Sequence, residues 1–354
     1  MRQSRKLDHL KYSLALKDGP GMSGFADISL IHNCLPNLHW DEIDVSTAIA
    51  GIGIEIPLII NAITGGAKDV AAVNGQIAEF ACRTNMPMAV GSQYAALENS
   101  EVEQSYKIVR EKNPKGVIFA NLGAHATPRQ AQLAVEMIDA QAIQIHLNVA
   151  QELIMSEGDR GFAGYLNNIA SIVERVNVPV IVKEVGCGIA HEQAKQLANI
   201  GIQVIDVGGK GGTNFMAIEA ARSQLDVKQE LLSWGIPTAI SAIEVQSILP
   251  NQLDMMVSGG IRTPLDVIKA LALGGVAAGM ATPIVKMLYD KDMEYAIAWF
   301  KQFIHEIKCY MMLLGAGNIR NLSKVPVVIT GYTREWLTAR GIDITRYGIN
   351  KQHG

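Results

Sequence analysis

Apolar and polar positions follow two different periods along the chain from about residue 57 onward. Short runs rich in Val, Ile and Ala are each followed by a longer stretch with helical spacing. This order of strand and helix is typical of a parallel sheet with crossover helices. The pattern predicts eight strands, at residues 57–63, 87–92, 116–123, 142–148, 179–186, 202–209, 254–260 and 276–281.

A ninth apolar run, residues 236–245, competes for a place among the strands. It contains Pro237, Ser241 and Glu244, which fit the start of a helix better than a buried strand. We therefore assign this run to the crossover after the sixth predicted strand.

Eight strand–helix units indicate the α/β class. They favour a closed (β/α)8 barrel, or TIM barrel, over an open doubly wound sheet of about six strands. The length of 354 residues fits one large barrel as well as two average domains. No repeat or low-complexity linker marks a second domain. We expect one domain, with an N-terminal extension at 1–56, the barrel at 57–290, and the last helix and tail at 291–354.

One predicted strand, residues 142–148, alternates strictly between apolar and polar side chains. Its apolar positions are Ile143, Ile145 and Leu147, and its polar positions are Gln144, His146 and Asn148. In a barrel the outer face lies under helices, so the polar side chains must point inward, toward an interior that is normally apolar. This pattern favours a functional site at the mouth, with Gln151 and Glu152 in the loop beyond. The alternative is a polar layer whose hydrogen bonds are satisfied internally.

The last two predicted strands end in a pattern that suits an anion. After Ser258 two glycines precede a helix with Thr263 as N-cap, Pro264 at its first position and Asp266 in its first turn. Thr282 and Pro283 open the next helix in the same way. Two helix N-termini with exposed backbone N–H groups, beside Arg262, predict a phosphate site, because the loops after strands seven and eight hold phosphate in many barrels. The alternative is that Gly259, Gly260 and Gly279 only allow tight turns.

The other glycine runs carry weaker signals. Residues 208–214 lack the GxGxxG spacing, and Lys210 follows no Walker loop, so neither nucleotide motif is present. Thr213 is available to bond a ligand, and residues 63–66 let a flat ring approach the backbone. Lys183 lies in an apolar strand and requires an anionic partner. Glu184 faces the opposite side of that strand, so an anionic ring or a phosphate would serve.

Composition excludes several classes of protein. The net charge is −3 with no dense Lys/Arg block, so nucleic acid is not an expected partner. No uncharged apolar span reaches 18 residues, and the N-terminus lacks a signal-peptide core, so we expect a cytoplasmic chain without a membrane role.

The four cysteines lack CxxC spacing, which indicates neither zinc nor disulfides, and they are expected to be buried. They are Cys34, Cys82, Cys187 and Cys309.

Motifs spread over nearly the whole chain together resemble the type 2 isopentenyl diphosphate isomerase family. They are SRKLDH (4–9), ITGG (63–66), GSQ (91–93), NLG (121–123), QIHLNVAQE (144–152), KEVG (183–186), GGKGGTNF (208–215), SGGIR (258–262) with GMA (279–281), and KVPVVITGYTREWL (324–337). SGGIR with GMA is similar to the FMN site of many flavin barrels. The Arg-Lys N-terminus combined with HLNxxQE is far more specific. Tyr94 departs from the pattern, since some relatives carry arginine there.

The resemblance implies an FMN-dependent interconversion of isopentenyl and dimethylallyl diphosphates in isoprenoid biosynthesis, with reduced flavin as acid and base. NADPH would reduce the flavin, Mg2+ would bridge Glu152 to the diphosphate, and the chain would form a homotetramer or larger assembly. By similarity, the substrate would be bound by Arg5, Lys6, His9, His146, Asn148 and Gln151, with Gln151 also nearest to a catalytic role. FMN would be held by Thr64, Gly65, Gly66, Ser92, Asn121, Lys183, Thr213, Gly259, Gly260, Arg262, Met280 and Ala281.

Two other functions compete with this interpretation. An FMN-dependent 2-hydroxy-acid oxidase or dehydrogenase would share the barrel and SGGIR, but it needs a histidine base and a substrate-binding arginine, and residues 206–215 contain neither. A non-catalytic flavin-binding protein would not need to keep Arg5, Lys6, His146, Gln151 and Glu152 together.

Overall fold

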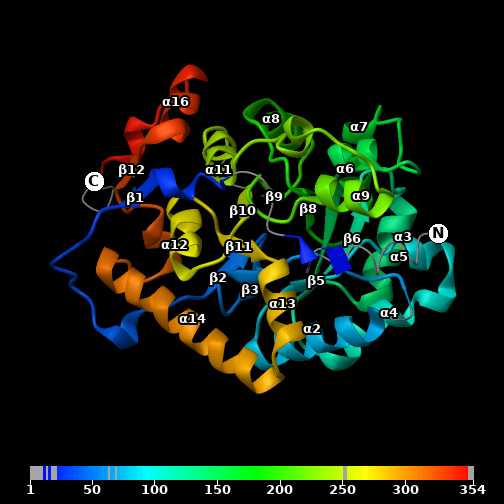
Figure 1. The fold of residues 1–354 in the computed structure, drawn as a ribbon. Helices are drawn as coiled ribbons and strands as arrows, with labels where there is room; N and C mark the ends of the chain where they lie inside the picture. The colour runs from blue at the N-terminus through cyan, green and yellow to red at the C-terminus, as the bar shows by residue number, and fades with distance from the viewer. Residues whose placement is uncertain are drawn as a thin grey trace.

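The computed structural model describes residues 11–12, 15–16, 22–62, 64–67, 70–249 and 253–349. Arg5, Lys6 and His9 lie outside the described residues. Eight parallel strands form one closed barrel in the order β10-β11-β4-β5-β6-β7-β8-β9, with β9 pairing back to β10 (Figure 1). The predicted (β/α)8 barrel is therefore confirmed.

Each of the eight predicted runs supplies one strand of the barrel. The strands are β4 (Leu58–Ile60), β5 (Met88–Ala89), β6 (Ile118–Gly123), β7 (Ala142–Leu147), β8 (Val180–Glu184), β9 (Val204–Asp206), β10 (Asp254–Ser258) and β11 (Ala277–Met280). The ninth apolar run is helical, as predicted: it lies in α11 (Thr238–Gln246), between β9 and β10.

Helices surround the barrel (Figure 1). Between β4 and β8 they are α2 (Ala71–Thr84), α3 (Tyr94–Glu98), α4 (Gln104–Lys112), α5 (Pro128–Ile138), α6 (Val149–Ile154) and α7 (Tyr165–Arg175). Beyond β8 they are α8 (His191–Asn199), α9 (Phe215–Ser223), α10 (Gln229–Leu232), α11, α12 (Pro264–Ala272), α13 (Thr282–Asp290), α14 (Met293–Leu314), α15 (Ile319–Leu322) and α16 (Gly331–Ala339). Single 3-10 turns are η1 (Phe25–Asp27), η2 (Trp40–Glu42), η4 (Ser100–Val102) and η5 (Thr345–Tyr347).

The lower half of the barrel interior is an apolar ring with one side chain from every strand. The ring consists of Ile59, Ala89, Phe119, Ala142, Ile181, Val204, Met256 and Ala277. A hairpin of β2 (Thr47–Ile49) and β3 (Ile52–Ile54) closes it from below, with Ile49 and Ile54 in the same cluster. The N–H of Ala50 in the hairpin turn donates to Asp254 at the start of β10, over 2.6 Å. Water is thereby excluded from this end.

Two residues further along each strand, the interior becomes polar. Because successive side chains of a strand alternate between faces, position i+2 points the same way as position i. The second ring consists of Asn61, Gly91, Asn121, Gln144, Lys183, Asp206, Ser258 and Gly279. Gln144 therefore points inward, as predicted, whereas Ile143 and Ile145 pack in the separate cluster beneath the helices.

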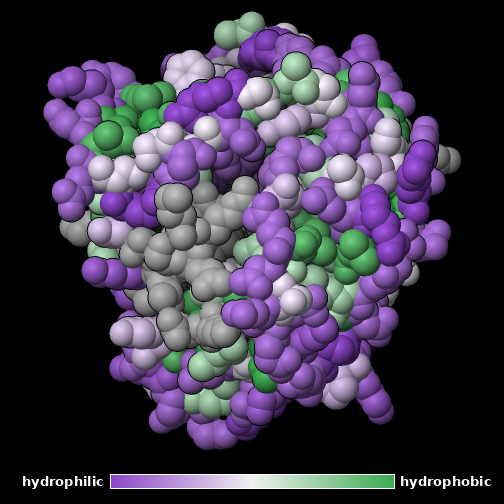
Figure 2. All heavy atoms as spheres, turned by 90° about the vertical axis from the view of Figure 1, so that its right-hand side faces the viewer, coloured by the Kyte–Doolittle hydropathy of each residue, from purple (hydrophilic) through white to green (hydrophobic). Residues whose placement is uncertain are grey.

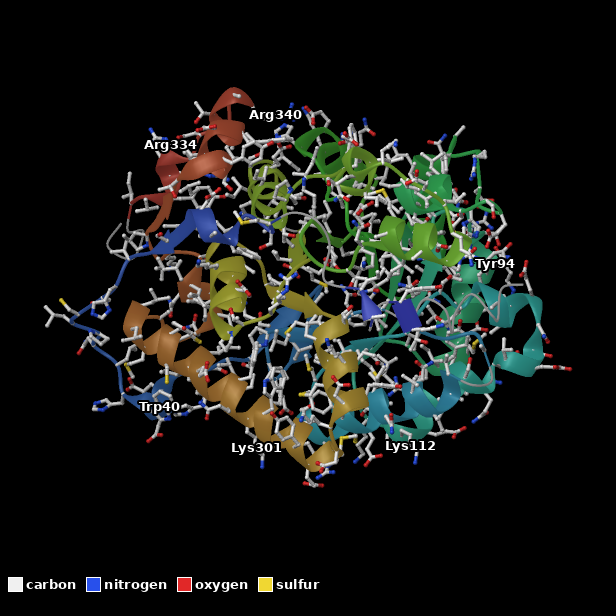
Figure 3. All side chains as sticks on the ribbon, viewed as in Figure 1. Trp40, Tyr94, Lys112, Lys301, Arg334 and Arg340 are labelled. Carbon is white, nitrogen blue, oxygen red and sulfur yellow. The ribbon has the colours of Figure 1, made fainter. Side chains whose placement is uncertain are left out.

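The two ends of the described chain clasp each other outside the barrel. Strand β1 (Ile28–Leu30) pairs antiparallel with β12 (Val327–Ile329), and α16 lies beyond them at the upper left of Figure 1. Asp27 caps α16 by accepting the N–H of Thr333 over 2.9 Å. At the other end of α16, Arg340, at the top of Figure 3, pairs with Glu192 of α8 and Glu244 of α11. The tail is thus fastened to the helical shell.

The expected burial of the cysteines is wrong. All four are free thiols, with Cys34 and Cys82 exposed and Cys187 and Cys309 half-buried. Cys34 lies in the loop after β1, and Cys82 faces outward from α2. No helix among the described residues is long and apolar enough to cross a membrane. The face in Figure 2 is mainly hydrophilic, with hydrophobic residues in small separate patches.

The apolar ring generates a stability prediction. Replacing Phe119, which has no exposed surface, with alanine should lower the free energy of unfolding by about 3 to 5 kcal/mol, because a large cavity opens in the barrel floor. Urea denaturation followed by circular dichroism measures the change. Tyr289→Ala, at an exposed position of α13, is the matched control and should change stability by less than about 0.5 kcal/mol. Equal effects of the two substitutions would contradict the packing argument.

Candidate active site

A cleft opens at the carboxyl ends of β8 to β11, beside the end of β4. Seven of the residues predicted to hold a cofactor line it: Lys183, Thr213, Gly259, Gly260, Arg262, Met280 and Ala281. The structure therefore brings together residues that are up to about 100 positions apart in the sequence.

Two glycine loops form the floor of this cleft by packing backbone against backbone. A Cβ on Gly259 would lie 2.1 Å from the carbonyl oxygen of Gly209, and one on Gly260 would lie 2.6 Å from that of Gly211. Both residues also have positive φ angles, 108° and 78°, which favour glycine. The glycines of both loops thus let the two main chains pack closely and form a shallow cradle that lines the cleft.

The two helix N-termini at the cleft differ from each other. At α12 the predicted N-cap is confirmed, because Thr263 and Asp266 form a reciprocal capping box. The Asp266 carboxylate also accepts the N–H groups of Arg262 and Thr263, so these groups are not exposed to a ligand, contrary to the prediction. At α13 the prediction is wrong: Ala281 is the N-cap, Thr282 is the first helical residue, and no side chain caps the helix, whose first residues line the cleft. Its N-terminus and Arg262 are therefore the stronger anion-binding groups.

Lys183 points into the barrel and is buried. Its ammonium group donates to the carbonyl oxygen of Glu184 over 2.8 Å. Among the described residues no carboxylate lies within ion-pair distance of it, so its charge is available to an anionic ligand at the cleft. Such a group can hold negative charge on a bound ring or phosphate.

Glu184 is a second buried charge beside the cleft, and the sequence pattern gave it no role. One carboxylate oxygen accepts the N–H groups of three consecutive residues, Val185, Gly186 and Cys187. Burial raises the pKa of Glu184 to about 7, and these backbone donors oppose that shift. Burial also raises the pKa of the neighbouring Cys187 thiol to about 12, so this thiol stays protonated at neutral pH. Glu184 holds the loop that lines one wall of the cleft.

The other predicted cofactor residues lie along β4 to β6, outside the lining of this cleft. They are Thr64, Gly65, Gly66, Ser92 and Asn121. The hydroxyl of Thr64 is buried and has no hydrogen-bond partner. The Cβ side of Gly65 and Gly66 faces the Tyr106 ring, so on that side these glycines make room for Tyr106 rather than for a ligand. The hydroxyl of Tyr106 donates to the carbonyl of Ser92, which fixes the next loop.

Asn148 and Gln151 of the predicted substrate residues lie beside Glu152 at the end of β7; Gln151 and Glu152, expected in a loop, are in the short helix α6. Asn148 donates to Glu152 over 2.9 Å, and the second oxygen of Glu152 accepts the N–H of Asp159. Gln151 donates to Glu219 of α9 over 2.8 Å. Because Glu219 is buried and also paired with Arg222 at 2.7 Å, the amide of Gln151 is held in one orientation.

Several residues of the site and of the barrel interior beneath it were not identified from the sequence. Glu219 carries no recognisable motif and is identified only by its contact with Gln151 across two helices. Asn61, Asp206 and Ser258 could have been found, because each is polar at an inward position of an otherwise apolar strand. That is the signal that singled out residues 142–148.

Tyr94, where some relatives carry arginine, begins α3 at the right of Figure 3. Its ring contacts His125 edge-on, with the ring centroids 4.9 Å apart. A tyrosine at this position supplies no positive charge to a phosphate.

An anion cradle after the last two strands is common to many phosphate-binding barrels, and residues 112–328 match the family model of FMN-dependent dehydrogenases, which places the chain in a class of flavoproteins. Among solved structures, a lactate oxidase from Pediococcus acidilactici superposes with a TM-score of 0.69 over 94% of this chain and 93% of its own, at 16% identity. That likeness concerns the fold alone.

Full-length relatives narrow the class. Isopentenyl-diphosphate delta-isomerases from Symbiobacterium thermophilum and Bacillus pumilus are 44% and 45% identical to this chain, over 97% and 100% of it and 97% and 99% of their own lengths. The chain belongs to the isopentenyl-diphosphate delta-isomerase family.

The cleft fits FMN on two observations. Arg262 and the uncapped N-terminus of α13 suit its phosphate. Glycines line the cradle with main chain, and Lys183 supplies a buried positive charge beside it. Outside the lining of the cleft, the buried hydroxyl of Thr64 has no hydrogen-bond partner among the described protein atoms.

The raised pKa of Glu184 generates a prediction about stability and pH. In the folded state this carboxyl binds its proton up to about pH 7, whereas its ordinary pKa is 4.5. Its contribution to stability is therefore fully present below pH 4.5 and lost as pH rises through 7. Relative to Glu184→Gln, which cannot ionise, the wild type should lose up to about 3 kcal/mol across this interval. Urea denaturation of both proteins at each pH measures the difference, and parallel profiles would refute it.

Proposed function

We propose that this enzyme interconverts isopentenyl diphosphate and dimethylallyl diphosphate by adding a proton at C4 and removing one from C2. The observation that carries the proposal is the relationship to isopentenyl-diphosphate delta-isomerases over essentially the full chain. The geometry supports it, because polar groups suited to a diphosphate lie at the end of β7 and an anion cradle lies at the ends of β10 and β11.

Reduced FMN, when bound, supplies the acid and base and an electron-rich surface for the cationic carbon of the transition state. The chain's residues bind and orient. Arg262 and the α13 terminus would hold the cofactor phosphate, and Lys183 would favour negative charge on the ring. Gln151, fixed by Glu219, would position the reacting carbons. Holding the diphosphate away from those carbons supplies orientation without hindering the chemistry.

His146, Asn148 and Gln151 would contact the diphosphate, and Glu152 would bind Mg2+ that bridges to it. Mg2+ is commonly held by one or two carboxylates together with substrate phosphates. Among the described residues no three His, Cys, Asp or Glu side chains form a metal site. A single carboxylate completed by the diphosphate agrees with this arrangement. Arg5, Lys6 and His9 would add positive charge from the N-terminal extension.

The proposal includes the cellular setting of the reaction. NADPH would reduce the FMN, the enzyme would act in the cytoplasm, and it would work as a homotetramer or larger assembly. A 2-hydroxy-acid oxidase remains the rival suggested by the fold, but no observation at this cleft favours it. The loop after β9 offers glycines, Lys210 and Thr213, and no histidine.

The first test is proton NMR of isopentenyl diphosphate incubated anaerobically in D2O with the protein, FMN, Mg2+ and dithionite. Deuterated dimethylallyl diphosphate should form with reduced flavin and be absent in the oxidised control. If FMN binds and no product forms under reduction, the isomerase proposal fails, and 2-hydroxy acids should then be screened as reductants of the flavin.

The role of Glu152 predicts a specific change in metal dependence. Glu152→Gln should raise the Mg2+ concentration needed for half-maximal activity by about 10- to 100-fold, because a charged ligand is lost. Titrating Mg2+ in the NMR assay measures this. Asp159→Asn is the matched control, since Asp159 is an exposed carboxylate in the loop that follows α6, and it should shift the requirement by less than about twofold. Equal shifts would remove Glu152 as the metal ligand.

A further inference from the structure

The second ring of the barrel interior, called the polar ring below, contains a continuous line of hydrogen bonds. The line crosses the interior from β9 to β7. Asn61 donates to Asp206 over 2.7 Å, and Gln144 donates to the Asn61 carbonyl over 2.9 Å. Asn121 donates to the Gln144 carbonyl over 3.0 Å, and the Asn121 carbonyl lies 2.9 Å from Nδ1 of His146. Asp206 and Gln144 have no exposed surface, and Asn61 and Asn121 are also buried. Four links therefore join Asp206 to the proposed diphosphate-binding histidine.

The direction of this line is set at the Asp206 end. Its carboxylate receives three donors: the Ser258 hydroxyl at 2.6 Å, the Asn61 amide at 2.7 Å and the N–H of Gly208 at 3.4 Å. An ionised carboxylate only accepts, so Asn61 must turn its NH2 group toward Asp206. Its carbonyl then faces the other way. The N–H of Ala62 also donates to that carbonyl, at the longer distance of 3.1 Å, and favours the same orientation.

The orientation of each following amide is fixed by its hydrogen bond to the amide before it. A carbonyl from Asn61 can only accept, so Gln144 must present its NH2 group and turn its own carbonyl toward Asn121. Asn121 must do the same, and its carbonyl oxygen is what His146 meets. An imidazole nitrogen facing a carbonyl oxygen has to carry a proton to form a hydrogen bond.

We propose that Asp206 is a positioning residue that keeps a proton on Nδ1 of His146 across the barrel. A reversed line would present the NH2 group of Asn121 and require an unprotonated Nδ1. Either Asp206 or His146 could set the orientation of the three amides. Asp206 sets it, because hydrogen bonds to a charged acceptor are about twice as strong as neutral ones.

The consequence concerns the other ring nitrogen of His146. With Nδ1 protonated in every state, Nε2 is the atom that gains or loses a proton. It lies at the carboxyl end of β6, where a Cβ on Gly123 would be 3.3 Å from it. This step rests on the proposed function: on contact with a diphosphate, Nε2 would take up a proton and donate it as a charge-assisted hydrogen bond.

Nitrogen-15 NMR of the full chain, reconstituted with FMN and labelled at its histidines, tests the proposal. The His146 signals are assigned by their loss in His146→Gln and are followed over pH until the imidazole is neutral. The wild type should then show a pyrrole-type Nδ1 and a pyridine-type Nε2. In Asp206→Leu, which removes both acceptor oxygens, the Nδ1-protonated form should fall to a mixture or be lost.

Two further variants separate the line from general damage to the barrel. Ser258→Ala removes a donor to the other oxygen of Asp206 and leaves the link to Asn61, so it should keep the wild-type pattern. Gln144→Met breaks the line in the middle and keeps both ends, so it should behave like Asp206→Leu. If Asp206→Leu does not fold, Gln144→Met still tests whether the line, rather than Asn121 alone, holds the proton, and wild-type signals in it would overturn the proposal.

The outcomes are distinct. Wild-type signals in both Asp206→Leu and Gln144→Met would overturn the proposal, since Asn121 alone would then fix the proton. If Asp206→Leu keeps the wild-type signals and Gln144→Met does not, the role of Asp206 is overturned. The Ala62 N–H would then be the group that orients the amides. An Nε2-protonated neutral ring in the wild type would overturn the proposal directly.

Adding inorganic pyrophosphate with Mg2+ to the FMN-loaded protein separates this inference from the proposed function. Nε2 should become pyrrole-type while Nδ1 is unchanged. If pyrophosphate leaves Nε2 unaffected, the assignment of His146 to the diphosphate fails, whereas the tautomer of the protein without pyrophosphate still supports the line from Asp206.

Discussion

A polar group inside a closed parallel barrel has neither water nor a free strand edge to bond with, and the structure depends on how that constraint is met. Burying such a group without a partner costs about 1 to 3 kcal/mol. The described side chains of the polar ring meet it mainly by bonding one another, from Ser258 and Asp206 through three amides to His146. The apolar ring below keeps water out of the same space. A rigid polar surface is thereby presented to the mouth.

The mouth built on this base has two unlike halves. The side formed by β8 to β11 is made largely of backbone, with glycines that let its loops pack closely and a few cationic or dipolar groups around them. The side formed by β7, α6 and α9 is made of long side chains held by buried charges, such as Gln151 by Glu219. The first half suits a flat phosphorylated cofactor, and the second suits a small anionic substrate with a metal.

The fold was predictable because strand and helix periods are local properties of the sequence. All eight strands and the helical nature of residues 236–245 followed from them. The inward direction of Gln144 followed from alternation alone. What failed depended on partners remote in sequence: Asp266 occupies N–H groups that were expected to be exposed, and Glu219 reaches Gln151 from another helix. Cysteine burial failed because composition carries no information about which side of a helix faces the core.

The clasp between the chain ends has a consequence for biosynthesis. Ile28 pairs with Ile329 and Asp27 caps the helix that follows. At roughly 5 to 20 residues per second, a ribosome needs about 15 to 60 s to make the chain between them. Throughout that time β1 has no partner strand, and its unpaired edge is a template for other chains. The barrel can close once β11 has emerged, but its outer fastening waits for β12.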